Sequence, residues 1–121
     1  MEIKKRKILI IEDDASSRES LSTFLEEAGY EVISAVDGYE GLELMKSVNP
    51  DLVLTDNRLP KVNGIELACI NESFNPKIPF IIISASDNLQ DYIVNLSVKS
   101  FMQKPIDIMV LKETIENIFT N

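Results

Sequence analysis

The sequence of 121 residues contains no histidine, no tryptophan and a single cysteine, Cys69. Without histidine there is no imidazole for acid–base catalysis, for a Ser-His-Asp triad or for most zinc sites. A lone cysteine forms neither an intramolecular disulfide nor a cysteine cluster, which fits a reducing cytoplasm. Cys69 itself is expected to be a small buried hydrophobe on a helix face. The chemistry must therefore come from carboxylates, hydroxyl groups or lysine.

Long apolar segments and glycine-rich loops are missing too. The apolar run 8–11 has four residues and ends in three acids, so it is too short for a signal peptide or a membrane span. Neither a Walker sequence nor G-x-G-x-x-G occurs, so a bound nucleotide would lack its usual phosphate-binding loop. We expect no membrane partner and no nucleotide site.

Acidic residues exceed basic ones by 20 to 12, and the formal net charge is −8. Such a chain is a poor partner for bare nucleic acid or for an anionic membrane surface, so we expect no direct nucleic acid binding. The excess is uneven, because residues 8–56 carry twelve acids and two bases. This distribution points to a cation site.

Short β-branched apolar runs alternate with longer segments of helical period. The runs predict strands at 8–11, 31–35, 52–55, 80–83 and 100–103. The helical segments predict helices at about 16–28, 38–48, 64–69, 89–96 and 108–118. Five repeats of strand then helix predict an α/β fold with a parallel sheet covered on both faces.

Capping residues mark several expected helix ends. Ser16 and Glu19 have the spacing of a capping box, and Gly29 is expected to end the first helix. Asn63 and Glu66 have the same spacing at the start of the third helix. Asp37 with Gly38 is expected to open the second helix, and Asn49 with Pro50 to end it.

Polar residues follow four of the five predicted strands. They are Glu12 and Asp13 after the first strand, Asp56 after the third, Ser84 after the fourth and Lys104 after the fifth. In open parallel sheets, ligands bind beyond the carboxyl ends of the strands, where the strand order reverses. We therefore expect these side chains to form one site.

Converging carboxylates repel one another, and something must compensate for that repulsion. Mg²⁺ does so with oxygen ligands, and its remaining positions can hold phosphate oxygens. Lys104 adds positive charge and Ser84 a hydrogen-bond donor, which together suit a phosphoryl group. Since histidine and a catalytic cysteine are missing, the available nucleophile is a carboxylate, and the product would be an aspartyl phosphate. The phosphoryl donor is then another protein or a small phosphorylated molecule.

Four segments of the chain follow a recognisable order: Ile8–Asp14, then Asp51–Pro60 with Gly64, then Ile81–Ala85, and last Lys104–Pro105. Together they resemble the receiver domain of bacterial two-component response regulators over essentially the whole chain. The resemblance implies a flavodoxin-like, doubly wound sheet of five parallel strands in the order 2-1-3-4-5 with five helices, as in chemotaxis regulators. We expect one receiver domain, residues 1–121, with no effector domain in this chain.

The resemblance also implies a role for each site residue. Asp56 would be the phosphoacceptor, Asp13 would bind Mg²⁺ directly, and Glu12 would bind it through water. The backbone carbonyl of Arg58 would complete the protein ligands, with Asp56 itself among them. Ser84 would hydrogen-bond the phosphoryl oxygen and Lys104 would pair with it.

Further positions carry implied roles outside the metal site. Phe101 matches an aromatic switch position whose ring turns inward when the hydroxyl of Ser84 moves toward the phosphate. The bond between Lys104 and Pro105 is expected to be cis, as is usual in the family. Arg58 and Ser86 stand where the family varies its dephosphorylation rate.

The implied function is that of a phosphorylatable receiver in a phosphorelay. A sensor histidine kinase or a histidine phosphotransfer protein would donate a phosphoryl group to Asp56, and the modified domain would change conformation and partner binding. Such a domain is not an enzyme with a separate substrate, because it catalyses only its own phosphorylation and dephosphorylation. The downstream effector and a phosphorylation-dependent dimer stay open.

The chain departs from the family pattern between Ser84 and Lys104. This interval is a couple of residues shorter than usual, and Ser97 to Ser100 replace the common Gly-Ala pair. We expect a shortened or irregular fourth helix, which would alter the usual output surface.

Two other functions fit parts of the pattern. A binding-only relative would keep the fold without being phosphorylated, although the complete set of acids, hydroxyl and lysine argues against it. A Mg²⁺-dependent phosphatase with an aspartyl nucleophile would place a second acid two residues after Asp56, where this chain has Arg58. Taken alone, the acids at 12–14 could simply lie at a solvated helix entrance.

Overall fold

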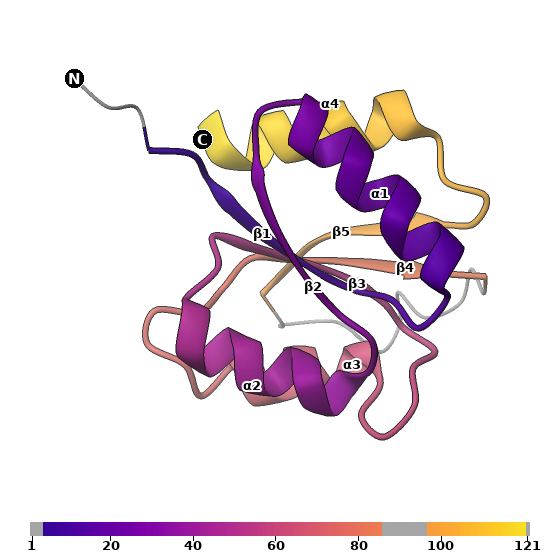
Figure 1. The fold of residues 1–121 in the computed structure, drawn as a ribbon. Helices are drawn as coiled ribbons and strands as arrows, with labels where there is room; N and C mark the ends of the chain where they lie inside the picture. The colour runs from indigo at the N-terminus through magenta and orange to yellow at the C-terminus, as the bar shows by residue number, and fades with distance from the viewer. Residues whose placement is uncertain (1–3, 86–96, 121) are drawn as a thin grey trace.

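The computed structural model describes residues 4–85 and 97–120, which form one parallel sheet flanked by helices (Figure 1). The strands are β1 (Lys7–Ile11), β2 (Glu31–Ala35), β3 (Leu52–Asp56), β4 (Phe80–Ser84) and β5 (Val98–Gln103). The helices in this part are α1 (Ala15–Glu27), α2 (Gly38–Val48), α3 (Gly64–Asn71) and α4 (Ile108–Thr120). The strand order is β2-β1-β3-β4-β5, so the predicted doubly wound fold is confirmed.

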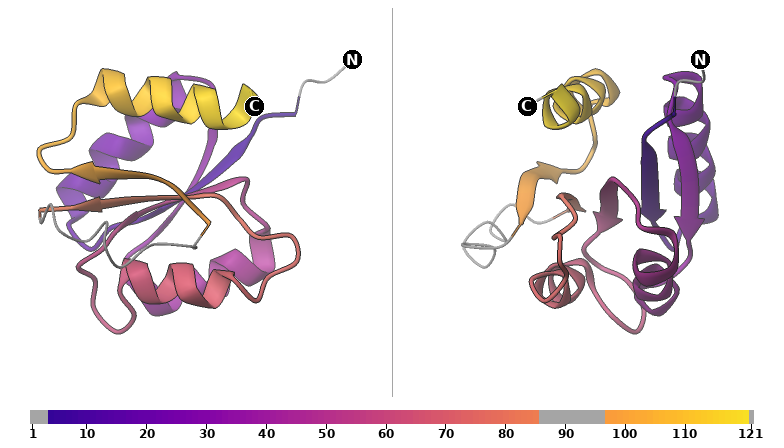
Figure 2. Two further views of the ribbon diagram at one scale, coloured as in Figure 1. Left: turned by 180° about the vertical axis from the view of Figure 1, so that it is seen from behind. Right: turned by 90° about the vertical axis from the view of Figure 1, so that its left-hand side faces the viewer.

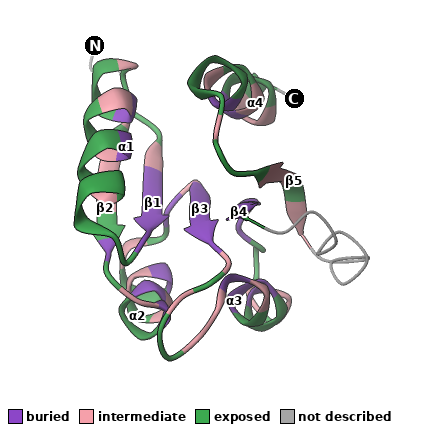
Figure 3. Cartoon of the chain, turned by 90° about the vertical axis from the view of Figure 1, so that its right-hand side faces the viewer, coloured by how far each residue is buried: buried purple, intermediate pink, exposed green. Residues whose placement is uncertain are grey.

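Helices cover both faces of the sheet, with α1 and α4 on one face and α2 and α3 on the other (Figures 1 and 2). Successive strand residues point to opposite faces. Ile8 and Ile10 of β1 therefore pack with α1 and α4, whereas Leu9 and Ile11 pack with α2 and α3. The central strands β1, β3 and β4 are almost entirely buried (Figure 3). This burial explains their unbroken apolar sequences.

Most helix ends lie where the capping residues predict. The side chain of Asp37 caps α2, Asn49 ends it in the left-handed conformation, and Gly29 follows α1 with a φ of +103°. Asn63 and Glu66 form the expected capping box of α3.

The capping box predicted at Ser16 and Glu19 is wrong. Asp14 caps α1 instead, because its carboxylate reaches the N–H of Ser17 at 2.8 Å, and the helix starts one residue earlier than predicted.

The fifth strand is longer than the sequence predicts. It begins at Val98, which pairs with Phe80, and the register shifts before Ile81 pairs with Ser100. The polar residues Lys99 and Ser100 at this bulge break the apolar run and hide the start of the strand. The fourth helix expected at 89–96 lies outside the described residues, as does its predicted shortening. Among the described helices, none is both long and apolar enough to cross a membrane.

Cys69 is exposed, and its predicted burial is therefore wrong. The buried face of α3 consists of Gly64, Leu67, Ala68 and Asn71, which recur at spacings of three and four residues. Cys69 follows Ala68 and is turned away from that face by the helical rotation of about 100° per residue.

Candidate functional site

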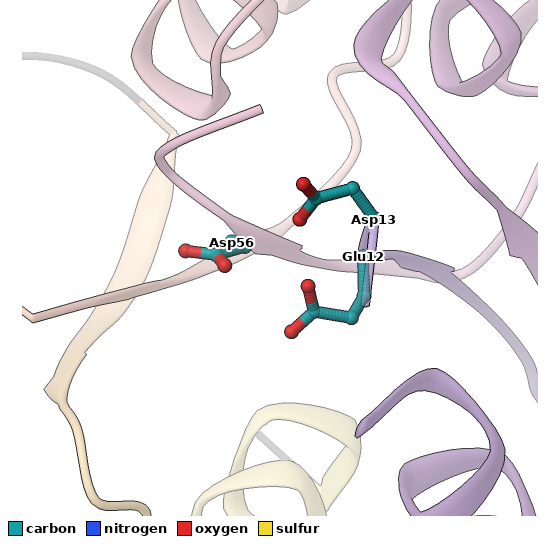
Figure 4. Close-up of side chains that lie close together, drawn as sticks. All are labelled: Glu12, Asp13 and Asp56. Carbon is teal, nitrogen blue, oxygen red and sulfur yellow. The ribbon is translucent and has the colours of Figure 1, made fainter. Parts of the chain in front are cut away.

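Three carboxylates meet at the carboxyl ends of β1 and β3. Glu12 and Asp13 follow the last residue of β1, and Asp56 is the last residue of the neighbouring strand β3. One oxygen from each lies within 4.8 Å of the others, and the three side chains converge on one space (Figure 4). Glu12 and Asp56 are 5% and 8% exposed, while Asp13 is open to solvent. The structure thus brings together the acids that the strand-end pattern singled out.

Lys104 completes this cluster from the loop after β5. Its ammonium lies 2.8 Å from Oδ2 of Asp56 and 3.9 Å from Oε1 of Glu12. The backbone N–H of Lys104 donates to the carbonyl of Ser84 at 2.8 Å, which extends the pairing of β4 and β5 to the site. The peptide bond between Lys104 and Pro105 is cis.

The loop between β1 and α1 is held by backbone contacts that the sequence did not reveal. The N–H of Asp14 donates to Oε2 of Glu12 at 3.1 Å. The guanidinium of Arg18 donates to the carbonyl oxygens of Glu12 at 2.9 Å and Asp13 at 3.5 Å. A base in the first turn of the helix that follows an acidic pair is the signal that could have identified this contact.

Burial and neighbouring charge shift two of the groups in the cluster. Burial raises the pKa of the Glu12 carboxyl above its ordinary value, and the charge of Asp56 raises it further. The hydrogen bond from the N–H of Asp14 and the ammonium of Lys104 lower the same pKa but do not cancel the rise. The hydrogen bond to Asp56 raises the pKa of Lys104, which the charges of Glu12 and Asp13 reinforce. Lys104 is therefore protonated at neutral pH, and burial disfavours the ionised form of Glu12.

A cleft of about 650 Å³ opens next to Asp56. It is lined by Asp13, Asp56, Asn57, Arg58, Ser84, Ala85 and Lys104. Ser84 is buried at the end of β4 and is one of the residues that line this cleft. The expected residues Arg58 and Ser84 thus lie beside Asp56, and Asn57 and Ala85 were not expected. Ser86 lies outside the described residues.

Gly64 allows the chain to pass close behind the site. A Cβ atom at this position would lie 2.9 Å from the carbonyl oxygen of Asp56 and 3.0 Å from Cα of Asn57. Only glycine therefore allows α3 to begin directly behind Asp56. Phe101 of β5 is half-buried and packs against the core on the α2 and α3 face.

The donor set suits a hard divalent cation. Glu12, Asp13 and Asp56 supply carboxylate oxygens within reach of one ion, and their mutual repulsion is only partly balanced by Lys104. Mg²⁺ prefers oxygen ligands of this kind and retains water in its open positions. The cleft leaves room there for a group that carries negative charge of its own.

Comparison with known proteins identifies the same family as the motifs. Residues 8–116 match the response regulator receiver domain family. The chain is 35% identical over 118 residues to a probable transcriptional regulator ycf27 of Porphyridium aerugineum, which covers 96% of this chain and 49% of that protein. It is 31% identical to the Regulator of RpoS of Escherichia coli, over 91% of this chain and 34% of the relative. The chain thus spans about half or less of the length of these curated relatives.

Solved structures agree in fold. The N-terminal domain of an uncharacterized protein from Wolinella succinogenes superposes with a TM-score of 0.86 at 38% identity, covering 95% of this chain and 94% of that one. The response regulator TrrA of Thermotoga maritima, solved in complex with Mg²⁺-BeF, gives 0.85 at 27% identity, with 93% and 98% covered. The receiver fold and the family predicted from the motifs are both confirmed. This chain belongs to the receiver domains of two-component response regulators.

Proposed function

We propose that Asp56 accepts a phosphoryl group from a phosphohistidine on a partner protein. The observation that carries this proposal is the surroundings of Asp56. Two further carboxylates lie within 4.8 Å, where they could hold a cation, and the ammonium of Lys104 lies at 2.8 Å. A carboxylate oxygen of Asp56 forms the new bond to phosphorus. The nitrogen–phosphorus bond of the donor breaks, and its electron pair stays on the imidazole.

The neighbouring residues have separate tasks in this transfer. Glu12, Asp13, Asp56 and the backbone carbonyl of Arg58 would hold Mg²⁺, with Glu12 acting through water. When bound, the ion neutralises charge on the phosphoryl oxygens. Lys104 pairs with a phosphoryl oxygen from the opposite side of the cleft, and the hydroxyl of Ser84 donates to another. The domain modifies only itself, since its own aspartate is the nucleophile and the phosphorylated aspartate is the product.

The modified domain then changes shape through Ser84 and Phe101. The hydroxyl of Ser84 moves toward the phosphoryl group, and the half-buried ring of Phe101 turns into the space behind it. Residues 1–121 as a single receiver domain and the cytoplasmic location remain predictions of the sequence, and the downstream effector stays open.

A groove beside the acidic cluster offers a surface for the phosphohistidine partner. About 590 Å³ in volume, it runs from Glu12 and Lys104 along Leu21 of α1 to Ile106 and Ile108 at the start of α4. Ile108, the first residue of α4, is 40% exposed. A histidine that reaches Asp56 must bring its own protein over this rim, and the exposed apolar side chains suit such a contact. We assign it to a sensor histidine kinase or a histidine phosphotransfer protein.

Mass spectrometry tests the phosphoacceptor. Incubation with Mg²⁺ and acetyl phosphate should add one phosphoryl group to the wild-type protein and none to Asp56→Asn. Asp51→Asn is the matched control, because it changes an aspartate at the other end of β3 and should be modified like the wild type. A folded wild-type protein that gains no mass from any donor would contradict the proposal, and turnover of a phosphoester would indicate a phosphatase instead.

The partner surface needs a different experiment. Ile108→Glu places a charge on a residue that lines the groove and should slow transfer from a histidine-phosphorylated protein, while leaving transfer from acetyl phosphate unchanged. Equal slowing with both donors would show that the change affects the site and not the docking.

A further inference from the structure

The loop between β3 and α3, residues 57–63, carries Arg58 past the acidic cluster. Asn57 anchors both ends of this loop: its carbonyl accepts the N–H of Gly64 at 3.0 Å, and its side chain accepts the N–H of Ile65 at 3.0 Å. Between these anchors the loop runs past α2 before it reaches α3 (Figure 3). The position of Arg58 therefore depends on what holds the middle of the loop.

The middle of the loop contains a strained turn at Lys61. Its φ of 72° lies in the left-handed region, which residues with a side chain rarely adopt. The N–H of Val62 donates to the carbonyl of Pro60 at 2.9 Å, so Lys61 is the central residue of a γ-turn of the uncommon positive-φ form. Such a conformation persists only where the surroundings impose it.

The first turn of α2 supplies those surroundings. The ammonium of Lys61 lies 3.3 Å from Oδ2 of Asp37 and 5.9 Å from the ring centre of Tyr39. Oδ1 of Asp37 accepts the N–H of Glu40 at 2.8 Å, which fixes this carboxylate as the cap of α2.

The main chain reinforces this contact. The N–H of Gly38 donates to the carbonyl of Pro60 at 3.3 Å, and a Cβ at Gly38 would lie 1.7 Å from the carbonyl oxygen of Val62. The backbones of α2 and the loop are thus in direct contact on either side of Lys61. The ion pair joins the same two segments, and Lys61 is its more exposed member.

We propose that Asp37 and Lys61 are positioning residues for the cation site. Their ion pair, packed on Tyr39, holds the strained loop so that the backbone carbonyl of Arg58 faces the acidic cluster. This inference rests on the proposed function, in which that carbonyl is a Mg²⁺ ligand. Lys61 acts through the backbone that connects it to Arg58, three residues earlier, and Asp37 acts through Lys61.

The direction in which Mg²⁺ affinity changes in Lys61→Met separates a positioning role from a purely electrostatic effect of the lysine charge. Lys61→Met removes a positive charge near the cation, and electrostatics alone would then tighten Mg²⁺ binding. A positioning role predicts the opposite: a dissociation constant about two- to fivefold weaker by calorimetric titration, the range that an exposed ion pair can supply. Lys61→Arg keeps the charge and should bind Mg²⁺ like the wild type.

Two further variants serve as controls. Lys77→Met makes the same substitution in another exposed ion pair, 2.9 Å from Glu72 and remote from the site, and should not weaken Mg²⁺ binding. Lys61→Gly accepts the positive φ without strain, so it should bind Mg²⁺ as weakly as Lys61→Met while unfolding at a higher temperature than that variant.

Mg²⁺ binding by the wild type and by Asp13→Asn distinguishes failure of the positioning role from failure of the proposed function. Asp13→Asn should abolish Mg²⁺ binding, and a wild-type protein that binds no Mg²⁺ would overturn both ideas. Wild-type binding that is lost in Asp13→Asn but unchanged or tighter in Lys61→Met would overturn the positioning role alone. A weakened Lys61→Met with a normal Lys61→Arg and a normal Lys77→Met supports it.

Discussion

The two aspartates at the ends of β3 differ in their partners. Asp51 precedes the strand, and its Oδ2 accepts the backbone N–H of Lys7 at 2.7 Å. Asp56 ends the strand, and its Oδ2 accepts the ammonium of Lys104 at 2.8 Å. The distances are nearly equal, but one partner is fixed in the backbone and the other is the tip of a long side chain. The first aspartate joins two strands, whereas the second, in the proposed function, has a partner that an incoming phosphoryl group can take over.

The same contrast extends to the polar groups around each end. Near the amino end, the buried amide of Asn71 donates to the carbonyl of Ile78 at 2.7 Å and accepts its N–H at 3.1 Å. At the carboxyl end, Glu12 and Asp56 are buried beside each other with like charges. Polar residues at the amino end therefore stabilise the fold, while the acids at the carboxyl end repel one another, and a bound cation would relieve that repulsion.

The largest expected difference between the ends concerns catalysis of phosphorylation. Lys104→Met removes the cation that faces the phosphoryl oxygens and should slow phosphorylation by acetyl phosphate about 100- to 1000-fold. Lys7→Met is the matched change at the amino end, and it keeps the backbone N–H that Asp51 accepts. Its rate, measured by mass spectrometry over time, should equal the wild-type rate. Similar rates for all three proteins would contradict the role assigned to Lys104.

The next effect concerns stability. Asn71→Ala leaves the N–H and the carbonyl of Ile78 buried without their partner and should lower the free energy of unfolding by about 2–3 kcal/mol. The phosphorylation rate should not change at temperatures where the variant is folded. Asn63→Ala, which removes an exposed cap of α3, is the control and should cost about 1 kcal/mol. An Asn71→Ala protein as stable as the control would contradict the assigned role.

Mg²⁺ should stabilise the fold through the carboxyl end alone. At a Mg²⁺ concentration ten times its dissociation constant, the free energy of unfolding should rise by about 1.4 kcal/mol. Thermal denaturation with and without EDTA measures this gain. It should vanish in Asp13→Asn and persist in Asp51→Asn. A gain that survives Asp13→Asn would place the ion elsewhere.

The smallest effect is a pH-dependent difference in the free energy of unfolding between Glu12→Gln and the wild type, measured in EDTA. Burial raises the pKa of Glu12 in the folded state above its ordinary value of 4.5, so its ionised form disfavours the fold. Below pH 4.5 the group is protonated in both states, and above the folded-state pKa the penalty is complete. The variant should therefore be more stable than the wild type at neutral pH, with an advantage that disappears on acidification. Denaturant titrations that give the same advantage at every pH would contradict this assignment.

The sheet, and the grouping of the acidic cluster with Lys104, could be predicted because they follow from local sequence pattern and from topology. Unbroken apolar runs such as 80–83 reveal strands buried on both faces, and parallel strands place their carboxyl ends together. These two rules led from the residue types to the grouping of Asp13, Asp56 and Lys104 without any knowledge of distances.

Features that depend on the path of the chain could not be predicted in this way. Ser16 and Asp14 are both acceptable caps by residue type, and only the bend after β1 decides for Asp14. Cys69 is apolar enough for a core, but the sheet contacts Leu67 instead. Nothing local indicates that Lys61 folds back onto Asp37, because the two residues are 24 positions apart in the sequence.

The hydrogen bond from Asp14 to Glu12 makes the amide proton of Asp14 a reporter of the state of the acidic cluster. This N–H ends on Oε2 of Glu12 at 3.1 Å, while the side chain of the same residue caps α1. Its resonance in an ¹⁵N-correlated NMR spectrum will respond to any change in the charge that Glu12 carries or faces. The amide of Lys104, bonded to the carbonyl of Ser84, offers a second signal from the far side of the cleft. These two backbone resonances would therefore report occupation of the site.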